Sequence, residues 1–207
     1  MPQRSHAGIE PALAVLGSTL RRACRAGAVT LLLIGALALL PGSHLAHADD
    51  PTAPATPAVI NPVELKIPAI GVDANIQDVG LADDGTMGVP VGFTDAAWYD
   101  LGVAPGQPGN AVFTGHISST AAPGVFYNID QLGPGNTIHV IGDDGTEQIY
   151  IVQEVDNDSA DSVPLDQIFA PTDQPGVVLI TCTGDWDPVA HLFSNRVVVW
   201  ATLSTGQ

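Results

Sequence analysis

The stretch from Leu179 to Trp200 reads LITCTGDWDPVAHLFSNRVVVW, in which two apolar runs flank a polar connection. The apolar runs extend outward as GVVLITC at 176–182 and RVVVWATL at 196–203. Both are rich in β-branched residues, which favour strands, and the connection holds the Gly, Asp and Pro that are typical of turns. This stretch therefore predicts a β-hairpin.

Upstream of the hairpin, short β-type runs separated by Gly, Pro, Asn and Asp continue back to Pro62. Asp143-Asp144-Gly145 predicts a tight hairpin turn. Short helices are predicted at 125–132 and 165–169, and no long amphipathic helix is apparent. Many short strands with one or two short helices predict a mainly β fold, a single closed or nearly closed β-barrel. The other predicted strands are 63–67, 74–80, 110–117, 137–142 and 147–155.

The N-terminal part has the composition of an export segment. Residues 26–40, AGAVTLLLIGALALL, are apolar and follow three closely spaced arginines, and Ala46-His47-Ala48 has the form of a signal-peptidase site. We expect residues 1–48 to be a signal peptide or an N-terminal membrane anchor, and either places the rest outside the cytoplasm. Residues 49–61, rich in Pro, Thr and Ala, are predicted to be a tether to the barrel domain at 62–207.

The charge distribution excludes one class of partner. Of the 22 acidic residues only Glu10 precedes the apolar run, and the part beyond that run has just two basic residues, Lys66 and Arg196. A nucleic-acid partner is excluded because no basic patch exists to displace counterions from phosphates.

Cys182 is the single cysteine of the predicted barrel domain. In an exported domain a lone thiol is either buried or present for its chemistry, and its position leaves both readings open. Because Cys182 ends an apolar predicted strand and precedes a polar loop, we expect it at the rim of the barrel, within reach of a substrate.

Two other residues are placed in a similar way. His116 ends the predicted strand 110–117, and Arg196 begins the predicted strand after the Cys182 hairpin. A hairpin would set Cys182 and Arg196 at neighbouring strand ends, where a guanidinium can favour a thiolate or hold an oxyanion. The alternative for Arg196 is a surface salt bridge, and His139 and His191 are interpreted as ordinary strand and loop positions.

Several motifs together resemble the sortase family, the cysteine transpeptidases of Gram-positive cell surfaces. The resemblance covers about Val63 to Leu203, and its anchors are Phe113-Thr114-Gly115-His116, Leu179-Ile180-Thr181-Cys182 and Arg196. Further stretches are most similar to class F sortases, with class E as the second choice. These stretches lie at 67–81, 98–117 and 123–140.

This resemblance implies an eight-stranded β-barrel with Cys182 as nucleophile, His116 as general acid and base, and Arg196 as oxyanion or substrate stabiliser. Thr181 would help to shape the substrate pocket. The implied reaction cleaves an LPXTG-like sorting signal between Thr and Gly through a thioacyl-enzyme, which an amine from a cell-wall precursor or a pilin then resolves. It implies no cofactor, and the sequence has no Cys/His cluster that predicts a metal site.

A non-catalytic alternative stays open at this point: an exported β-barrel that binds peptides and whose cysteine is buried and inert. Such a protein would not react with small thiol reagents while folded. An L,D-transpeptidase is disfavoured, because that family carries its His and Cys close together in an H-G-x-Cys setting, whereas His116 and Cys182 are far apart in this sequence.

Overall fold

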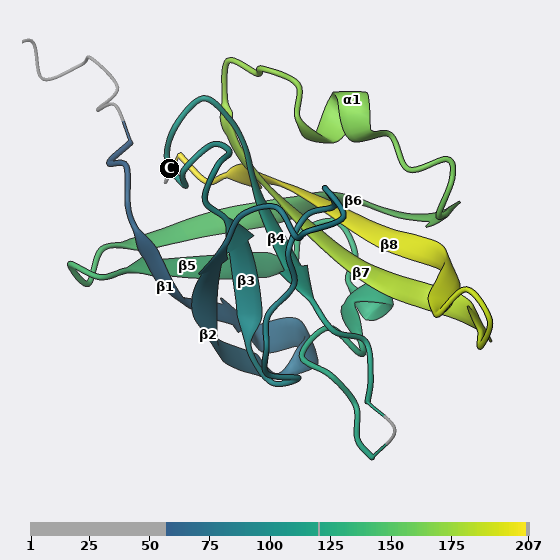
Figure 1. The fold of residues 1–207 in the computed structure, drawn as a ribbon. Helices are drawn as coiled ribbons and strands as arrows, with labels where there is room; N and C mark the ends of the chain where they lie inside the picture. Colours follow the sequence, from purple (N-terminus) through teal and green to yellow (C-terminus); the bar gives the residue numbers. More distant parts are fainter. Residues whose placement is uncertain (1–56, 120, 206–207) are drawn as a thin grey trace, which may run out of the picture. The chain divides into compact units, whose positions relative to one another are not determined.

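A computed structural model describes residues 57–119 and 121–205. These residues form eight strands with two 3₁₀ turns and one short α-helix (Figure 1). The strands are β1 Pro62–Ile67, β2 Val72–Val79, β3 Ala96–Tyr99, β4 Gly109–Gly115, β5 Thr137–Gly142, β6 Glu147–Ser159, β7 Pro175–Asp187 and β8 Leu192–Leu203. The helical elements are η1 Pro68–Ile70, η2 Ile129–Gln131 and α1 Leu165–Ile168.

The eight strands close into one barrel in the order β1-β2-β3-β4-β7-β8-β6-β5, with β5 pairing back to β1. The pairs β2–β3 and β4–β7 are parallel, and the other neighbours are antiparallel. The predicted closed, mainly β barrel is therefore confirmed. Closure satisfies the backbone hydrogen bonds of every strand without leaving a sheet edge.

The seven predicted strands all form, but one strand was missed. β3 has only four residues, AAWY, and it lies between two longer strands. Its first three residues are all buried, so it lacks the alternation of exposed and buried positions that marks a strand in a sequence. Alanine has little strand preference of its own, so burial in the barrel determines this element.

The helix predicted at 125–132 is wrong except for the 3₁₀ turn η2. The backbone of this segment is bonded to other parts of the chain: Val125 N donates to Phe93 O (2.7 Å) and Phe126 N donates to His116 O (3.0 Å). These contacts draw the segment against the end of β4, where side chains of Val125 and Phe126 occupy the space that a Cβ at Gly115 would need. The predicted helix at 165–169 is confirmed as α1.

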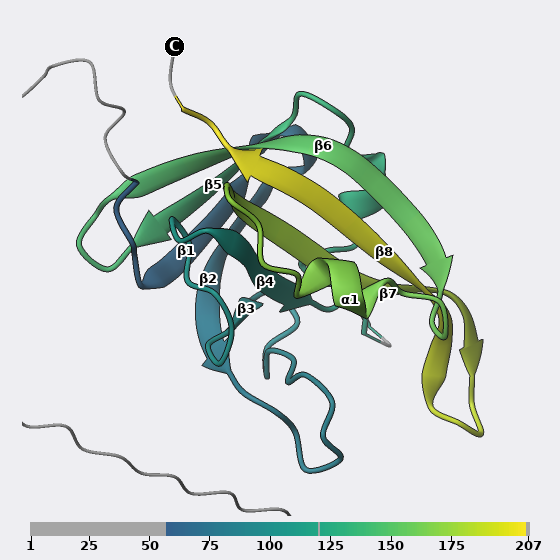
Figure 2. The same ribbon diagram turned by 90° about the horizontal axis from the view of Figure 1, so that it is seen from above.

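Two apolar clusters lie on opposite faces of β4, β7 and β8. One fills the barrel and includes Phe113 and Leu179; the other includes Val178 and Ile180 and packs under Ile168 of α1, on the outer face. Figure 2 shows α1 lying over this part of the sheet. Successive side chains of a strand point to opposite faces, so the two clusters together bury both faces of β7 from Pro175 to Thr181.

The chain before β1 also packs on the barrel. Ile60 is buried in the core, and its backbone N donates to Pro105 O (3.1 Å). The buried Tyr150 hydroxyl donates to the Gln148 side chain, whose amide in turn donates to Ala58 O. Burial raises the pKa of Tyr150, so this hydroxyl stays protonated at all ordinary pH values.

The predicted leader at 1–48 and most of the predicted tether at 49–61 lie outside the described residues. Within the ranges that are described, no helix has both the length and the apolar character needed to cross a bilayer.

Candidate active site

Cys182 lies in β7 at the point where the buried part of the strand ends. Residues from Pro175 to Thr181 are all buried, whereas Cys182 is partly exposed. The prediction that the strand ends at Cys182 is wrong, because β7 continues to Asp187 and pairs with β8 beyond the barrel. Figures 1 and 2 show this hairpin extending past the neighbouring strands. The thiol therefore lies beside a projecting two-stranded arm.

Arg196 is the direct partner of Cys182 in the β7–β8 ladder. Directly opposite residues of an antiparallel pair point to the same face of the sheet. Cys182 follows Val178 and Ile180 in the alternation of β7, and these two belong to the outer cluster. The predicted pairing of Cys182 with Arg196 is confirmed, and both side chains lie on the outer face of the barrel rather than in its mouth.

His116 follows the last residue of β4, which runs parallel to β7. The last pair of the β4–β7 register is Thr114 with Ile180, and His116 and Cys182 each follow two residues later on these two parallel segments. The end of β4 is fixed to β7 because the buried Thr181 hydroxyl donates to Gly115 O (2.7 Å). The three predicted catalytic residues thus lie on neighbouring segments: Cys182 and Arg196 face each other within the β7–β8 ladder, and His116 lies just beyond β4.

Thr181 itself lies on the opposite face of β7 from Cys182, because the two are adjacent in one strand. Its hydroxyl contacts Gly115, the residue directly before His116, and this bond holds the thiol-bearing and imidazole-bearing segments side by side.

The imidazole of His116 is oriented by the connection between β2 and β3, residues 80–95. Its Nε2 lies 2.8 Å from Pro90 O, and its ring centroid is 4.6 Å from that of Phe93. A carbonyl oxygen only accepts, so Nε2 must carry a proton in this contact. In the neutral ring Nδ1 is then the nitrogen that can take up a proton.

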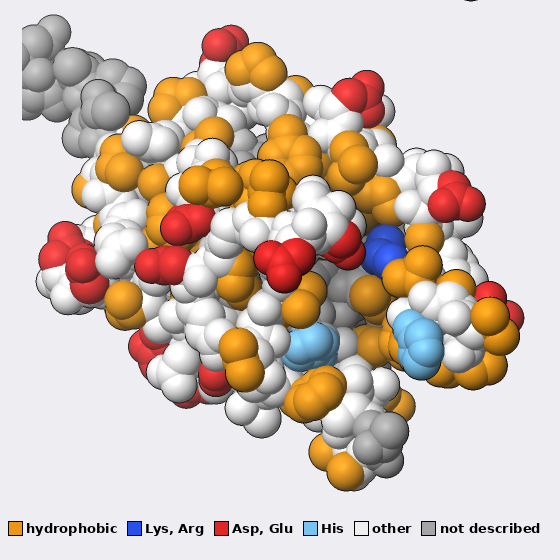
Figure 3. Space-filling view, in the orientation of Figure 1, with side chains coloured by type: hydrophobic (Ala, Val, Ile, Leu, Met, Phe, Trp, Pro, Cys, Tyr) orange, Lys and Arg blue, Asp and Glu red, His pale blue; other side chains and the backbone are white. Residues whose placement is uncertain are grey.

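Arg196 is held by the backbone of the hairpin. Its Nη1 donates to Phe193 O (2.9 Å) and to Asn195 O (2.8 Å). In the described ranges, the salt bridges involve Lys66 and His139, and Arg196 forms none. The alternative of a surface ion pair is therefore not observed, although acidic side chains are numerous on the face seen in Figure 3.

The sequence did not reveal the contribution of the β2–β3 connection. Besides the contacts of Pro90 and Phe93 with His116, Gly88 O accepts a hydrogen bond from the Thr114 hydroxyl (3.2 Å). Val91 is 91% exposed in this same connection. The only sequence signal was a mostly apolar run, VPVGF at 89–93, in a segment that is otherwise a loop.

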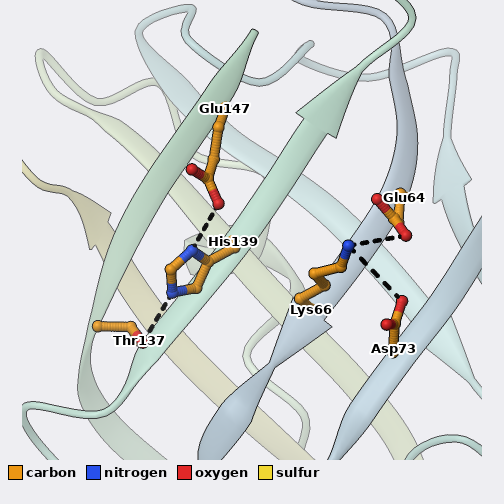
Figure 4. A network of polar contacts seen from close by, with 6 residues as sticks. All are labelled: Glu64, Lys66, Asp73, Thr137, His139 and Glu147. Carbon is orange, nitrogen blue, oxygen red and sulfur yellow. Dashed lines mark hydrogen bonds and ion pairs between the residues drawn. The ribbon is translucent and has the colours of Figure 1, made fainter. Parts of the chain in front are cut away.

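The other two histidines of the described residues, His139 and His191, are placed as predicted. His139 is a strand position in β5, where its Nδ1 lies 2.8 Å from Glu147 and its Nε2 lies 3.0 Å from the Thr137 hydroxyl (Figure 4). His191 lies in the turn of the β7–β8 hairpin with a φ of 55°. Among the described residues, no group of three or more His, Cys, Asp or Glu side chains is arranged to hold a metal ion.

Fold and site together define a closed β-barrel protein with a cysteine, a histidine and an arginine on three neighbouring segments of one sheet. Residues 65–204 match the family described as "Sortase domain". The match covers well over half of the chain, and the chain belongs to the sortase family. Membership implies a sortase-type cysteine transpeptidase, protein substrates that carry sorting signals, and action outside the cytoplasm.

Solved structures of sortases have the same fold. The SrtA sortase from Actinomyces oris is 21% identical, with a TM-score of 0.55 over 72% of this chain and 87% of that one. A lid mutant of sortase A from Corynebacterium diphtheriae is 20% identical, with a TM-score of 0.54 over 72% and 71%. The Clostridium perfringens sortase D5 transpeptidase is 23% identical, with a TM-score of 0.52 over 70% and 79%. A search of the curated proteins found no match.

Proposed function

We propose that this protein cleaves an LPXTG-like sorting signal between Thr and Gly and transfers the acyl part to an amine. The proposal depends on one observation above all: Cys182 and Arg196 are direct ladder partners on the outer face, and the end of β4 brings His116 alongside. Nucleophile, oxyanion stabiliser and acid–base group are then available to one bound peptide.

In the acylation step, Nδ1 of His116 takes the proton of the Cys182 thiol, and Sγ attacks the threonine carbonyl carbon. A C–S bond forms, the carbonyl electron pair moves to oxygen, and the guanidinium of Arg196 stabilises that oxyanion. The C–N bond to glycine then breaks, and the departing amine takes a proton from Nδ1 of His116. Thr181 supports this geometry from the other face by holding Gly115 in place.

In the second step an amine resolves the thioester. Its nitrogen attacks the acyl carbon, the C–S bond breaks with its electron pair going to sulfur, and His116 accepts the proton that the amine loses. The acceptor is an amine of a cell-wall precursor or of a pilin, and water reacts more slowly.

The subclass and the location follow from the sequence stretches rather than from the fold. We place the protein in class F, with class E as the second choice, on the segments 67–81, 98–117 and 123–140. It acts at the cell surface, either anchored in the membrane through the apolar run at 26–40 or secreted after cleavage behind Ala48.

The competing proposal is a peptide-binding barrel with an inert cysteine. Partial exposure of Cys182 disfavours it, because an inert structural thiol is expected to be fully buried. The discriminating experiment treats the full-length protein with a small thiol reagent and, separately, with a fluorescent LPXTG peptide.

We expect reaction at Cys182 and peptide cleavage that added hydroxylamine accelerates. Cys182→Ala should lower cleavage by orders of magnitude. An unreactive thiol in a folded protein that leaves the peptide intact would favour the binding module instead.

A further inference from the structure

An open cavity of about 270 Å³ lies next to the proposed site, on the side of β4 away from β7. Its walls come from the β1–β2 turn at 70–73, from Thr94 just before β3, and from the segment after β4 at 123–128. Nothing in the proposed acylation step uses this cavity.

The cavity wall is joined to His116 by backbone contacts. Phe126 N donates to His116 O (3.0 Å) and Gly124 N donates to Ile117 O (2.8 Å). A Cβ on Gly124 would overlap the carbonyl of His116, so only glycine allows this close approach. Val125 N also donates to Phe93 O, and the Phe93 ring lies against the imidazole. One side of this wall faces the cavity and the other side supports His116.

The chemistry of the cavity favours a cation. Asp73 is the charged residue among those that line it, and Tyr127 presents a ring that is 51% exposed. A carboxylate and an exposed aromatic ring that line the same cavity can each attract ammonium or guanidinium groups, the first through charge and the second through the cation–π interaction. Lys66 lies 3.9 Å from Asp73 but only 2.9 Å from Glu64, so its charge is taken up mainly by Glu64 (Figure 4).

We infer that this cavity binds a second positive charge of the amine acceptor, while the acceptor's reactive amine attacks the thioester from the His116 side. This inference rests on the proposed transpeptidase function and adds the class of acceptor: a diamine, or a peptide with a further cationic group. The bound charge stays an ammonium beside Asp73. The attacking nitrogen is neutral, and its proton passes to His116 when the C–N bond forms and the C–S bond breaks.

The kinetic test compares two acceptors of equal chain length on the full-length protein with an LPXTG peptide. Cadaverine carries two amines, whereas its amino-alcohol analogue has a hydroxyl in place of one of them. We expect the wild type to form about two- to fivefold more cadaverine adduct per reactive amine at equal acceptor concentration, the range of an exposed charge pair. Asp73→Asn should abolish this preference.

The matched control is Asp173→Asn. Asp173 is exposed and lies just before β7, at the other end of that strand from Cys182, and the substitution changes the net charge by the same amount. This variant should keep the wild-type preference. Equal loss in both variants would mean that net charge, and not the cavity, attracts the acceptor, and would overturn the inference.

A binding measurement separates the inference from the proposed function. In the Cys182→Ala protein, cadaverine should shift the amide NMR signals of Gly71 and Gly124, and Asp73→Asn should remove these shifts. If the protein cleaves the peptide but shows no preference for cadaverine, the inference alone is overturned. The same holds if cadaverine shifts amide NMR signals away from the cavity and not those of Gly71 and Gly124. A wild-type protein that cleaves no peptide overturns the proposed function and the acceptor role together.

Discussion

Two outer surfaces of the same barrel use similar side chains in opposite ways. On the surface formed by β1, β2, β5 and β6, Lys66 is bonded to Glu64 and His139 to Glu147, so each of these two basic side chains has an acidic partner (Figure 4). Just beyond β4, His116 contacts a backbone carbonyl instead, and within β8 Arg196 donates to two of them.

The difference has a chemical consequence. A backbone carbonyl orients an imidazole or a guanidinium and leaves its charge in place. A carboxylate also orients the group, but it neutralises the positive charge and competes for the proton. Because the domain has so many acids, a basic group without an acidic partner must be kept apart from them by the fold. The backbone contacts of Phe193, Asn195 and Pro90 provide this separation.

The largest expected effect on cleavage comes from removing His116 or Arg196, the two basic side chains that contact backbone carbonyls. His116→Ala should lower peptide cleavage by about 10²- to 10⁴-fold, the usual contribution of general acid–base catalysis. Arg196→Ala should lower it by about 10²- to 10³-fold, as for loss of an oxyanion donor. The measurement is the initial cleavage rate of a fluorescent LPXTG peptide.

The controls for these variants are His139→Ala and Lys66→Ala, which remove a histidine and a different basic residue from the surface of β1, β2, β5 and β6. Both should keep the rate within about twofold of wild type, since surface pairs contribute little even to stability. If a control variant lost as much activity as its counterpart, the two surfaces would not differ as we describe.

A smaller effect is expected from the two threonines that contact these regions. Thr181→Val removes the bond to Gly115 O and leaves a buried carbonyl without its partner, at a cost of about 1–3 kcal/mol in the free energy of unfolding. It should also slow cleavage about tenfold, because the end of β4 shifts relative to Cys182.

Thr137→Val removes the contact with His139 and should change the free energy of unfolding by less than about 0.5 kcal/mol. Denaturant titration measures both costs. Thr181→Ser keeps the hydroxyl and should restore the cleavage rate, so failure of this rescue would argue against a positioning role.

Much of the fold could be predicted because its strands satisfy local rules. β5 alternates partly buried and fully buried residues at every position, and the turn after it contains Asp144 and Gly145, with Gly145 at a φ of 80°. β3 gave no such signal, since its position depends on neighbours that are distant in the sequence. The helix predicted at 125–132 was based on the Pro-Gly and Gly-Pro pairs that flank it, yet the backbone of this segment bonds to Phe93 and His116, which no local pattern encodes.

The ladder pairing of Cys182 with Arg196 was predictable from the sequence, but the surroundings of the candidate residues were not. The spacing of Cys182 and Arg196 around turn residues was enough to predict their pairing. That they lie on the outer face follows from the second apolar cluster under α1, which requires knowledge of the packing. The role of Pro90 and Phe93 depends on the path of a long connection, and loop paths are set by tertiary contacts rather than by composition.

The smallest expected effect is a change in the pH dependence of stability, and it involves Asp144 in the turn between β5 and β6. Hydrogen bonds from the backbone and side chain of Thr146 hold the pKa of Asp144 below its ordinary value of 3.8. A lowered pKa in the folded state stabilises the protein above the unfolded-state pKa, and the benefit is lost as the pH falls through the folded-state value.

Asp144→Asn should therefore be slightly less stable than wild type at neutral pH, and the difference should shrink below about pH 4. Thermal unfolding of both proteins across this range measures it. Cleavage activity at neutral pH should be unchanged, and a difference in stability that grew on acidification would contradict the assignment.

The central claim is that the thiol of Cys182 becomes acylated by a peptide held beside His116 and Arg196. Intact-protein mass spectrometry during turnover of an LPXTG peptide tests it directly. We predict an adduct of the acyl fragment that maps to Cys182, disappears when hydroxylamine is added and is absent in Cys182→Ala. Peptide cleavage that persists in Cys182→Ala, or an adduct on another residue, would contradict the account.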